Sequence, residues 1–191
     1  PGFAFDAALW RKGCKSNAVI PAGYTYLAQL MGHDLGHTVA ANAVPWTAQH
    51  ADETMPNARY NLIENPLTLE TIYGKGPMGT HGLYHARHCP FRLDKNATLA
   101  LRVRYTPDEP AEPLLADMRN RATLMLHKMA VLWMQYHNKT ARNIMAADGF
   151  DEASHAEHAY FFDVFTRARQ QVLRTWHGVV MQDILPTVAH P

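Results

Sequence analysis

The sequence predicts a mainly α-helical protein of one domain. Three segments, 24–40, 120–147 and 152–185, place apolar residues at steps of three and four, the spacing of one helix face. With 47% hydrophobic and 18% charged residues, the chain of 191 residues can bury a substantial core, which excludes an intrinsically disordered protein. The length is typical of a single domain, or of two small ones.

The composition argues against several functional classes. A net charge of +1 gives no sign of a polybasic surface for nucleic acid or membranes. No apolar run reaches about 18 residues, so neither a transmembrane segment nor a signal peptide is predicted. Two cysteines, Cys14 and Cys89, cannot form a disulfide framework. The unusual residue is histidine, with 12 copies, and we therefore look for chemistry among the histidines.

The first helix is predicted between an irregular lead-in, residues 1–23, and a loop over 45–61. Beyond that loop, "NPLTLETIYGKG" (65–76) predicts a short helix with Pro66 in its first turn and Gly74 at its end. The first helix carries apolar residues at helical spacing: Tyr24, Leu27, Met31, Leu35 and Val39.

Residues 75–117 are rich in proline and glycine and are predicted to form mostly long surface loops, with one strand-like stretch at 97–105. The two long helices that follow each carry a broad apolar face. In the first, which Gly149 ends, the face comprises Leu124, Met125, Met129, Leu132, Trp133 and Tyr136. In the second, which Pro186 ends, it comprises Phe161, Phe165, Ala168, Val172, Trp176, Val179, Val180 and Ile184.

A histidine-rich segment, "QLMGHDLGHT" (29–38), lies in the first predicted helix. In a helix, Gln29, His33 and His37 lie on one face, while Asp34 points about a hundred degrees away. His33, Asp34 and His37 could form part of the metal site of a metal-dependent hydrolase. A pair of histidines bonded to backbone or water accounts for the same pattern.

Two more residues stand out near the first long helix. His137 lies among bulky apolar side chains such as Trp133, which fits either a buried structural histidine or the axial ligand of a haem iron. Arg119 precedes the helix, where a cation opposes the helix dipole. It is either a solvated surface arginine or a fixed charge that stabilises a developing anion in a cavity.

Five segments, in this order, resemble the animal-type haem peroxidases of the peroxidase–cyclooxygenase superfamily, in their bacterial style. Arg119 and His137, 18 residues apart, lie in the third and fourth segments. The resemblance implies helices around a buried haem, joined by long loops. The segments, which span residues 23–186, are "GYTYLAQLMGHDLGHT", "RYNLIENPLTLETIYG", "LLADMRN", "MAVLWMQYHNKTA" and "FTRARQQVLRTWHGVVMQDILP".

The resemblance implies a haem-dependent peroxidase that reduces hydrogen peroxide through a ferryl intermediate and oxidises a small organic molecule or a halide. His33 corresponds to the distal histidine, Gln29 to the distal glutamine and Arg119 to the distal arginine. A histidine there moves a proton from one peroxide oxygen to the other. The arginine would stabilise the charge that develops on the departing oxygen.

His137 corresponds to the proximal iron ligand, and Met129 and Trp133 would line the haem. The family resemblance also implies a calcium site at Asp34, Thr68 and Glu70, whose oxygens suit a hard cation; a helix cap without metal explains the same residues. Haem b is expected to be held non-covalently, because the positions that bond it in mammalian relatives hold other residues: Gly32, Ala122 and Thr123.

Several alternatives stay open at this point. The family's catalytic domain continues beyond the "DILP" segment, so the resemblance implies that residues 1–191 form part of that domain and that a second chain could complete the haem pocket. A fatty-acid dioxygenase of the same superfamily fits the same residues. The remaining alternatives are a metal-dependent hydrolase using His33, Asp34 and His37, and an inactive haem-binding subunit.

Overall fold

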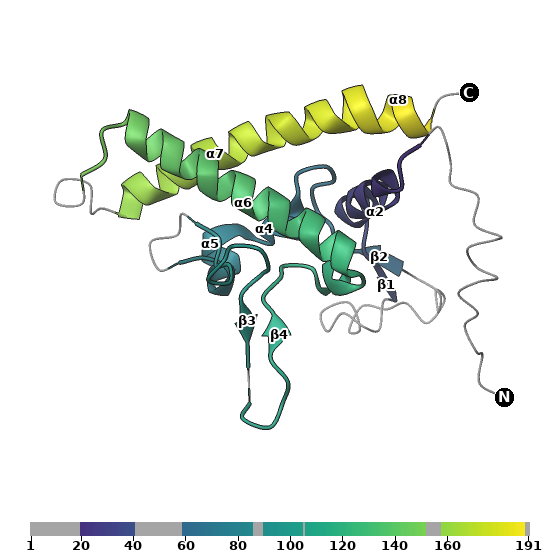
Figure 1. Ribbon diagram of the computed structural model, residues 1–191, viewed down its shortest axis with the longest axis horizontal. Helices are drawn as coiled ribbons and strands as arrows, with labels where there is room; N and C mark the ends of the chain where they lie inside the picture. The colour runs from purple at the N-terminus through teal and green to yellow at the C-terminus, as the bar shows by residue number, and fades with distance from the viewer. Residues whose placement is uncertain (1–19, 41–58, 86–89, 105, 152–157, 190–191) are drawn as a thin grey trace.

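A computed structural model describes residues 20–40, 59–85, 90–104, 106–151 and 158–189 (Figure 1). The part of the chain that it describes is mainly α-helical, as the sequence predicts. Most of the predicted lead-in and most of the predicted loop over 45–61 lie outside these ranges, as do both cysteines. Within them, no helix combines the length and the apolar character needed to cross a membrane.

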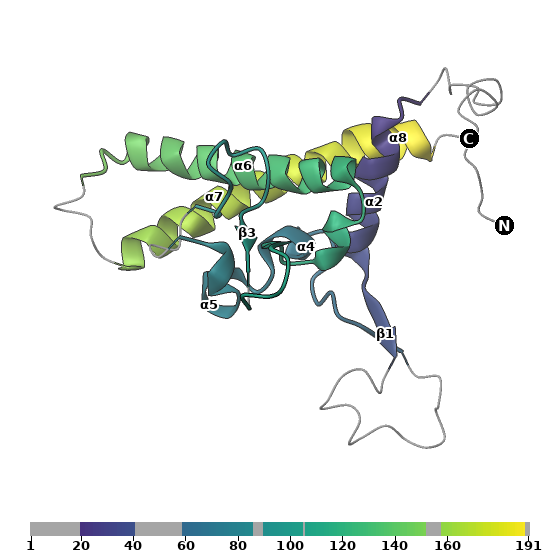
Figure 2. The same ribbon diagram turned by 60° about the horizontal axis from the view of Figure 1, so that its bottom comes forward.

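Two long antiparallel helices, α6 (Leu124–Ala147) and α7 (His158–Val179), form one layer of the molecule (Figures 1 and 2). The short helices and strands lie on one side of this pair, and α2 (Gly23–Leu35) packs near the start of α6. The main hydrophobic core fills the space between these layers and includes Trp133 and Trp176. The apolar face predicted for α7 is largely confirmed, since all but one of its residues are buried and Val179 is partly buried.

The inward face of α6 differs from the predicted one. Leu124, Met125 and Leu132 are exposed, at 67%, 48% and 56%. The helix instead turns a face inward that mixes apolar residues with polar ones: Leu126, His127, Ala130, Val131, Trp133, Met134, His137, Asn138, Thr140 and Ala141. Periodicity in apolar residues misses this face because its polar members are buried through specific hydrogen bonds, such as that from the Ala100 N–H to His127 Nε2 (3.2 Å).

Helix α2 ends at Leu35, five residues earlier than predicted, and the chain continues as strand β1 (Thr38–Ala40). This strand pairs antiparallel with β2 (Arg59–Asn61), so the end of the predicted loop is also a strand. The Asn61 side chain produces the change: its amide donates to the Leu35 carbonyl (3.2 Å) and its oxygen accepts the His37 N–H (2.7 Å). One side chain thus satisfies backbone groups that a longer helix would have used.

The segment between α2 and α6 contains more regular structure than predicted. The short helix expected from Pro66 begins only at Glu70, because Leu67 and Leu69 adopt left-handed backbone conformations (φ 60° and 54°) that interrupt it. The strand predicted over 97–105 is confined to two residues. The elements are α4 (Glu70–Tyr73), α5 (Gly76–Gly79), η2 (His81–Leu83), β3 (Arg102–Val103), its antiparallel partner β4 (Glu112–Pro113) and η3 (Met118–Arg121).

Of the two helix ends predicted from Gly149 and Pro186, the first is confirmed and the second is wrong. Gly149 ends α6 as predicted: it has a φ of +65°, and its N–H and that of Phe150 donate back to Ala146 and Met145 carbonyls (3.2 and 2.9 Å). Pro186 does not end its helix. A π-helical turn, η4 (Val180–Ile184), leads into α8 (Leu185–Val188), where Pro186 occupies the first turn and needs no hydrogen-bond acceptor.

Candidate functional site

His33 lies near the end of α2, partly buried, and its ring is held by a buried amide. His33 Nδ1 lies 2.8 Å from Asn120 Oδ1, and the Asn120 amide nitrogen donates to the carbonyl oxygen of Thr71 (3.1 Å) and to its hydroxyl (3.0 Å). A carbonyl can only accept a hydrogen bond, so the amide nitrogen must face Thr71 and the amide oxygen must face His33. The proton of the neutral ring is therefore on Nδ1, and Nε2 carries the lone pair.

The basic nitrogen of His33 is available to a substrate. Among the described residues, no hydrogen bond uses His33 Nε2, and the side chain is only partly buried. Gln29, four residues earlier on α2, is also partly buried and lies on the same side of the helix, as predicted. His37 is not on this face, because it follows the end of the helix and its N–H is bonded to Asn61. The predicted face of three residues is therefore reduced to two.

Arg119 holds the end of α2. Its guanidinium pairs with Asp117 (2.6 Å) and donates to the backbone carbonyls of His33 (2.9 Å) and Gly36 (2.7 Å). It therefore satisfies carbonyl groups left free where the helix stops. Burial alone would raise the pKa of the Asp117 carboxyl, but the hydrogen bonds and charge of Arg119 hold that pKa below its ordinary value. Neither a solvated surface arginine nor a cation free to meet an anion describes this residue.

The hydrogen bonds around Arg119 and Asn120 form a continuous set that we call the His33 network: His33, Thr71, Asp117, Arg119 and Asn120. The Thr71 hydroxyl donates to Asp117 Oδ2 (3.0 Å), which joins the amide of Asn120 to the ion pair of Arg119. Sequence reasoning missed three members. The signal for one of them was present in "ADMRN", since an arginine that is partly buried needs an acid partner and Asp117 lies two residues away.

Asp34 points about a hundred degrees around the axis of α2 from His33. Its carboxylate is fully buried and its Oδ2 accepts the Leu69 N–H (2.8 Å) and the Trp176 indole N–H (3.2 Å). Burial raises the pKa of this carboxyl, although these hydrogen bonds act to lower it. The structure thus does not bring Asp34 together with His33 and His37. In the described ranges, no cluster of three or more histidine, cysteine or acidic residues is arranged to hold a metal ion.

Two of the residues expected at a calcium site, Thr68 and Glu70, make hydrogen bonds to the backbone of the turn that precedes α4. The Thr68 hydroxyl donates to the Asn65 carbonyl (2.7 Å), and Glu70 Oε2 accepts the N–H groups of Glu64 and Asn65 (3.1 Å each). The other oxygen of Glu70 pairs with Lys75 (2.6 Å). Burial would raise the pKa of Glu70, but Lys75 and the backbone donors lower it. Neither side chain caps α4, and the calcium site stays a prediction.

His137 is enclosed by aromatic rings. Its side chain is fully buried, and its Nδ1 lies 3.0 Å from the Tyr73 hydroxyl. The rings of Tyr73, Phe91 and Phe165 surround it, with centroids 5.4, 5.2 and 5.1 Å from its own. These contacts are those of a buried structural histidine.

A haem ligand needs room for a flat macrocycle next to the ligating nitrogen. None of four cavities lined by described residues includes His33, Arg119 or His137. Trp133 packs edge-on against Trp176 (5.3 Å between ring centroids), and Met129 packs against the core. None of these cavities is lined by His137 or Trp133, so the haem contacts expected of both residues stay a prediction.

Comparison with models of protein families, with curated proteins and with solved structures finds no match to this chain. The resemblance to the peroxidase–cyclooxygenase superfamily therefore stays a prediction. What the structure contributes is the arrangement around His33.

The tautomer of His33 can be tested directly. In the Asn120→Ala variant, Nδ1 loses its acceptor, and we expect the ring to lose its preference for the Nδ1–H form. Long-range ¹H–¹⁵N correlation spectra near pH 8 would report which nitrogen carries the proton. The His37 signals serve as an internal control and should not change. An Nε2–H ring in the unsubstituted protein would contradict the orientation of the Asn120 amide.

The ion pair of Asp117 and Arg119 predicts a pH-dependent stability. Because the pKa of Asp117 is lowered in the folded state, its contribution is complete above the unfolded pKa of about 3.9 and is lost as the pH falls below it. We expect Asp117→Asn to lower the free energy of unfolding at pH 7 by about 1–3 kcal/mol, a range that allows for the partial exposure of Arg119.

The difference between Asp117→Asn and the unsubstituted protein should shrink as the pH falls from 5 to 3 in urea unfolding experiments. Asp108→Asn, at an exposed turn, is the matched control and should change the stability by less than about 0.5 kcal/mol at either pH. A constant difference across this pH range would show that charge on Asp117 is not what stabilises the fold.

Proposed function

We propose that the protein is a haem-dependent peroxidase and that this chain supplies the peroxide-facing histidine, His33. The observation that carries the proposal is the held tautomer: Asn120 accepts the Nδ1 hydrogen bond and leaves a basic Nε2 on a partly exposed face of α2. A neutral imidazole with one nitrogen held and the other available is what transfer of a proton between two peroxide oxygens requires.

In this proposal, His33 Nε2 accepts the proton of the nearer peroxide oxygen and returns it to the farther one, which leaves as water. While the ring is charged, its Nδ1–H stays bonded to Asn120 Oδ1, which stabilises the imidazolium. Gln29, one turn earlier, could donate a hydrogen bond to the bound peroxide from the same face. Haem b, when bound, would supply the iron that holds the peroxide and the two electrons that cleavage of the O–O bond consumes, which the second substrate would then return.

The role proposed for His33 does not depend on which residue is the axial ligand of the haem iron. His37 follows the end of α2, and the ring of His137 is fully buried with its Nδ1 beside the Tyr73 hydroxyl. We propose that a residue outside the described ranges, or a second chain, provides the axial ligand, and that the haem is held without covalent bonds to the chain. Complete extraction of the haem by acidified organic solvent would agree with the latter point.

A second candidate function is a non-enzymatic subunit that binds haem together with a partner. The guanidinium of Arg119 favours it, because Asp117 and two backbone carbonyls use its donors, so it is not free to stabilise charge on peroxide. The two candidates differ in one respect: only the peroxidase depends on the side chain of His33 for turnover.

The first measurement is an absorption spectrum of the purified chain with added haem b, before and after one equivalent of hydrogen peroxide. We expect a Soret band that shifts on peroxide addition, and a rate of that shift that falls by about 10²–10⁴ in His33→Ala. His37→Ala, four residues away but outside the helix, is the matched control and should leave the rate unchanged. Equal rates in both variants would favour the non-enzymatic subunit. No Soret band at all would mean either that a second chain must complete the haem pocket or that the chain does not bind haem.

The enclosed position of His137 gives a second test. We expect His137→Leu to lower the free energy of unfolding by about 1–3 kcal/mol, since it leaves the buried Tyr73 hydroxyl without its partner. The Soret band of the haem-loaded protein should persist. Tyr73→Phe, which removes the hydroxyl and keeps the imidazole, is the comparison variant. Loss of the Soret band with unchanged stability in His137→Leu would make His137 the iron ligand after all.

A further inference from the structure

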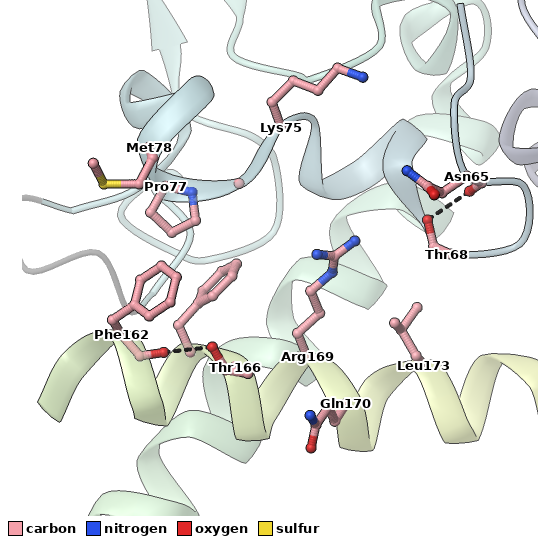
Figure 3. Close-up of a pocket in the computed structure, with 12 residues that line it drawn as sticks. Asn65, Thr68, Lys75, Pro77, Met78, Phe162, Thr166, Arg169, Gln170 and Leu173 are labelled. Atoms are coloured by element: carbon pink, nitrogen blue, oxygen red, sulfur yellow. Dashed lines mark hydrogen bonds between the residues drawn. The ribbon is translucent and has the colours of Figure 1, made fainter. Parts of the chain in front are cut away.

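A cavity of about 610 Å³ opens between α7 and the segment that runs from Asn65 to Met78 (Figure 3). Its walls are mostly apolar and include Pro77, Met78, Phe162, Phe165 and Leu173. None of the residues that line it belongs to the His33 network. The volume is within the range of small-molecule sites, about 300–1,000 Å³.

One cation in this cavity has no anionic partner in the part of the chain that the structure describes. Arg169 extends from α7 into the cavity, between the apolar walls (Figure 3). Its guanidinium carbon lies 5.1 Å from the centre of the Tyr73 ring. No hydrogen bond or ion pair among the described residues includes Arg169, and its Nε is buried without an acceptor. A buried N–H without an acceptor is costly, so an acceptor is expected here.

The other cation in the cavity wall is already neutralised. Lys75 Nζ pairs with Glu70 (2.6 Å) and Glu64 (3.0 Å), and these pairs raise the pKa of the ammonium group although burial acts in the opposite direction. On α7, the nearest acid in sequence, Asp163, pairs with Arg167 (3.2 Å) and is exposed. Among the described residues that line this cavity, the charge that calls for a counter-ion is therefore that of Arg169.

We infer that this cavity binds an organic monoanion, a carboxylate with an apolar chain, through Arg169. A guanidinium offers two parallel N–H donors that match a carboxylate, and Tyr73 holds one face of it in place. The apolar walls would take up the chain of the ligand. A single uncompensated cation between apolar walls suits a monoanion with an apolar body better than a hydrophilic dianion such as inorganic phosphate. This site is independent of the function proposed for His33.

The test uses decanoate as the probe and isothermal titration calorimetry on the full chain. We expect decanoate to bind at one site, and acetate and 1-decanol, which each lack one half of the ligand, to bind at least about 10-fold more weakly. Equal binding of 1-decanol would leave only an apolar groove and would overturn the assignment. Failure of decanoate to bind at millimolar concentration would overturn it as well.

Two variants test the role of Arg169. Arg169→Met keeps an apolar stem but removes the charge, and should weaken decanoate binding about 10- to 100-fold, the effect of losing a charge-assisted hydrogen bond. Thr166→Glu leaves the arginine in place but adds a carboxylate three residues away on the same helix face, and should weaken binding similarly. Arg174→Met, at an exposed position of α7, is the matched control.

Circular dichroism would check that each variant stays folded. Because Thr166 carries only a hydrogen bond to the Phe162 carbonyl of its own helix, Thr166→Glu tests the site even if Arg169→Met unfolds. Unchanged decanoate affinity in Thr166→Glu, or an equal loss in Arg174→Met, would overturn the inference.

Discussion

The position of the candidate site depends on the hydrogen bonds that Asn120 makes inside the protein. This fully buried amide joins α2, α4 and the turn before α6, and each of its polar atoms has a partner. In surroundings of low dielectric constant, such a network is strong when complete and costly when one member is lost. The side chain of His33 receives its orientation from Asn120, and the backbone carbonyl of the same residue is held by Arg119. Both ends of this residue are thus tied to the four-residue turn η3.

Helix geometry places two adjacent residues of α2, His33 and Asp34, in different surroundings. His33 presents a nitrogen on a partly exposed face, whereas Asp34 is buried and joins Leu69 and the indole of Trp176 in α7. The second oxygen of Asp34 has no partner among the described residues. The buried carboxylate therefore anchors the helix at some cost, as its raised pKa indicates. That anchor helps to fix the rotation of α2 about its axis and with it the position of His33 beside Asn120.

The helices were largely predictable because their apolar residues repeat at helical spacing, and Gly149 was correctly placed as the end of α6. What the sequence could not reveal was the set of contacts between distant residues. Asn61 ends α2 from 26 residues away, and Asp117 takes up the charge of Arg119. His137 was correctly singled out as unusual, but its chemistry depends on rings contributed by three separate segments. Local periodicity carries no information about such partners.

The polar residues buried along α6 explain why the apolar pattern misassigned its inner face. His127, His137 and Asn138 each meet a specific partner: the Ala100 N–H, the Tyr73 hydroxyl and the backbone of Phe91. Each hydrogen bond offsets the desolvation of its residue, so a polar side chain can occupy a core position that apolar spacing alone would exclude. As a consequence, Leu124, Met125 and Leu132 are left on the outer side of the helix. The same requirement for a partner separates two of the histidines: His137 is buried with Nδ1 beside the Tyr73 hydroxyl, whereas partly buried His33 has Nδ1 held by Asn120 and no hydrogen bond at Nε2 among the described residues.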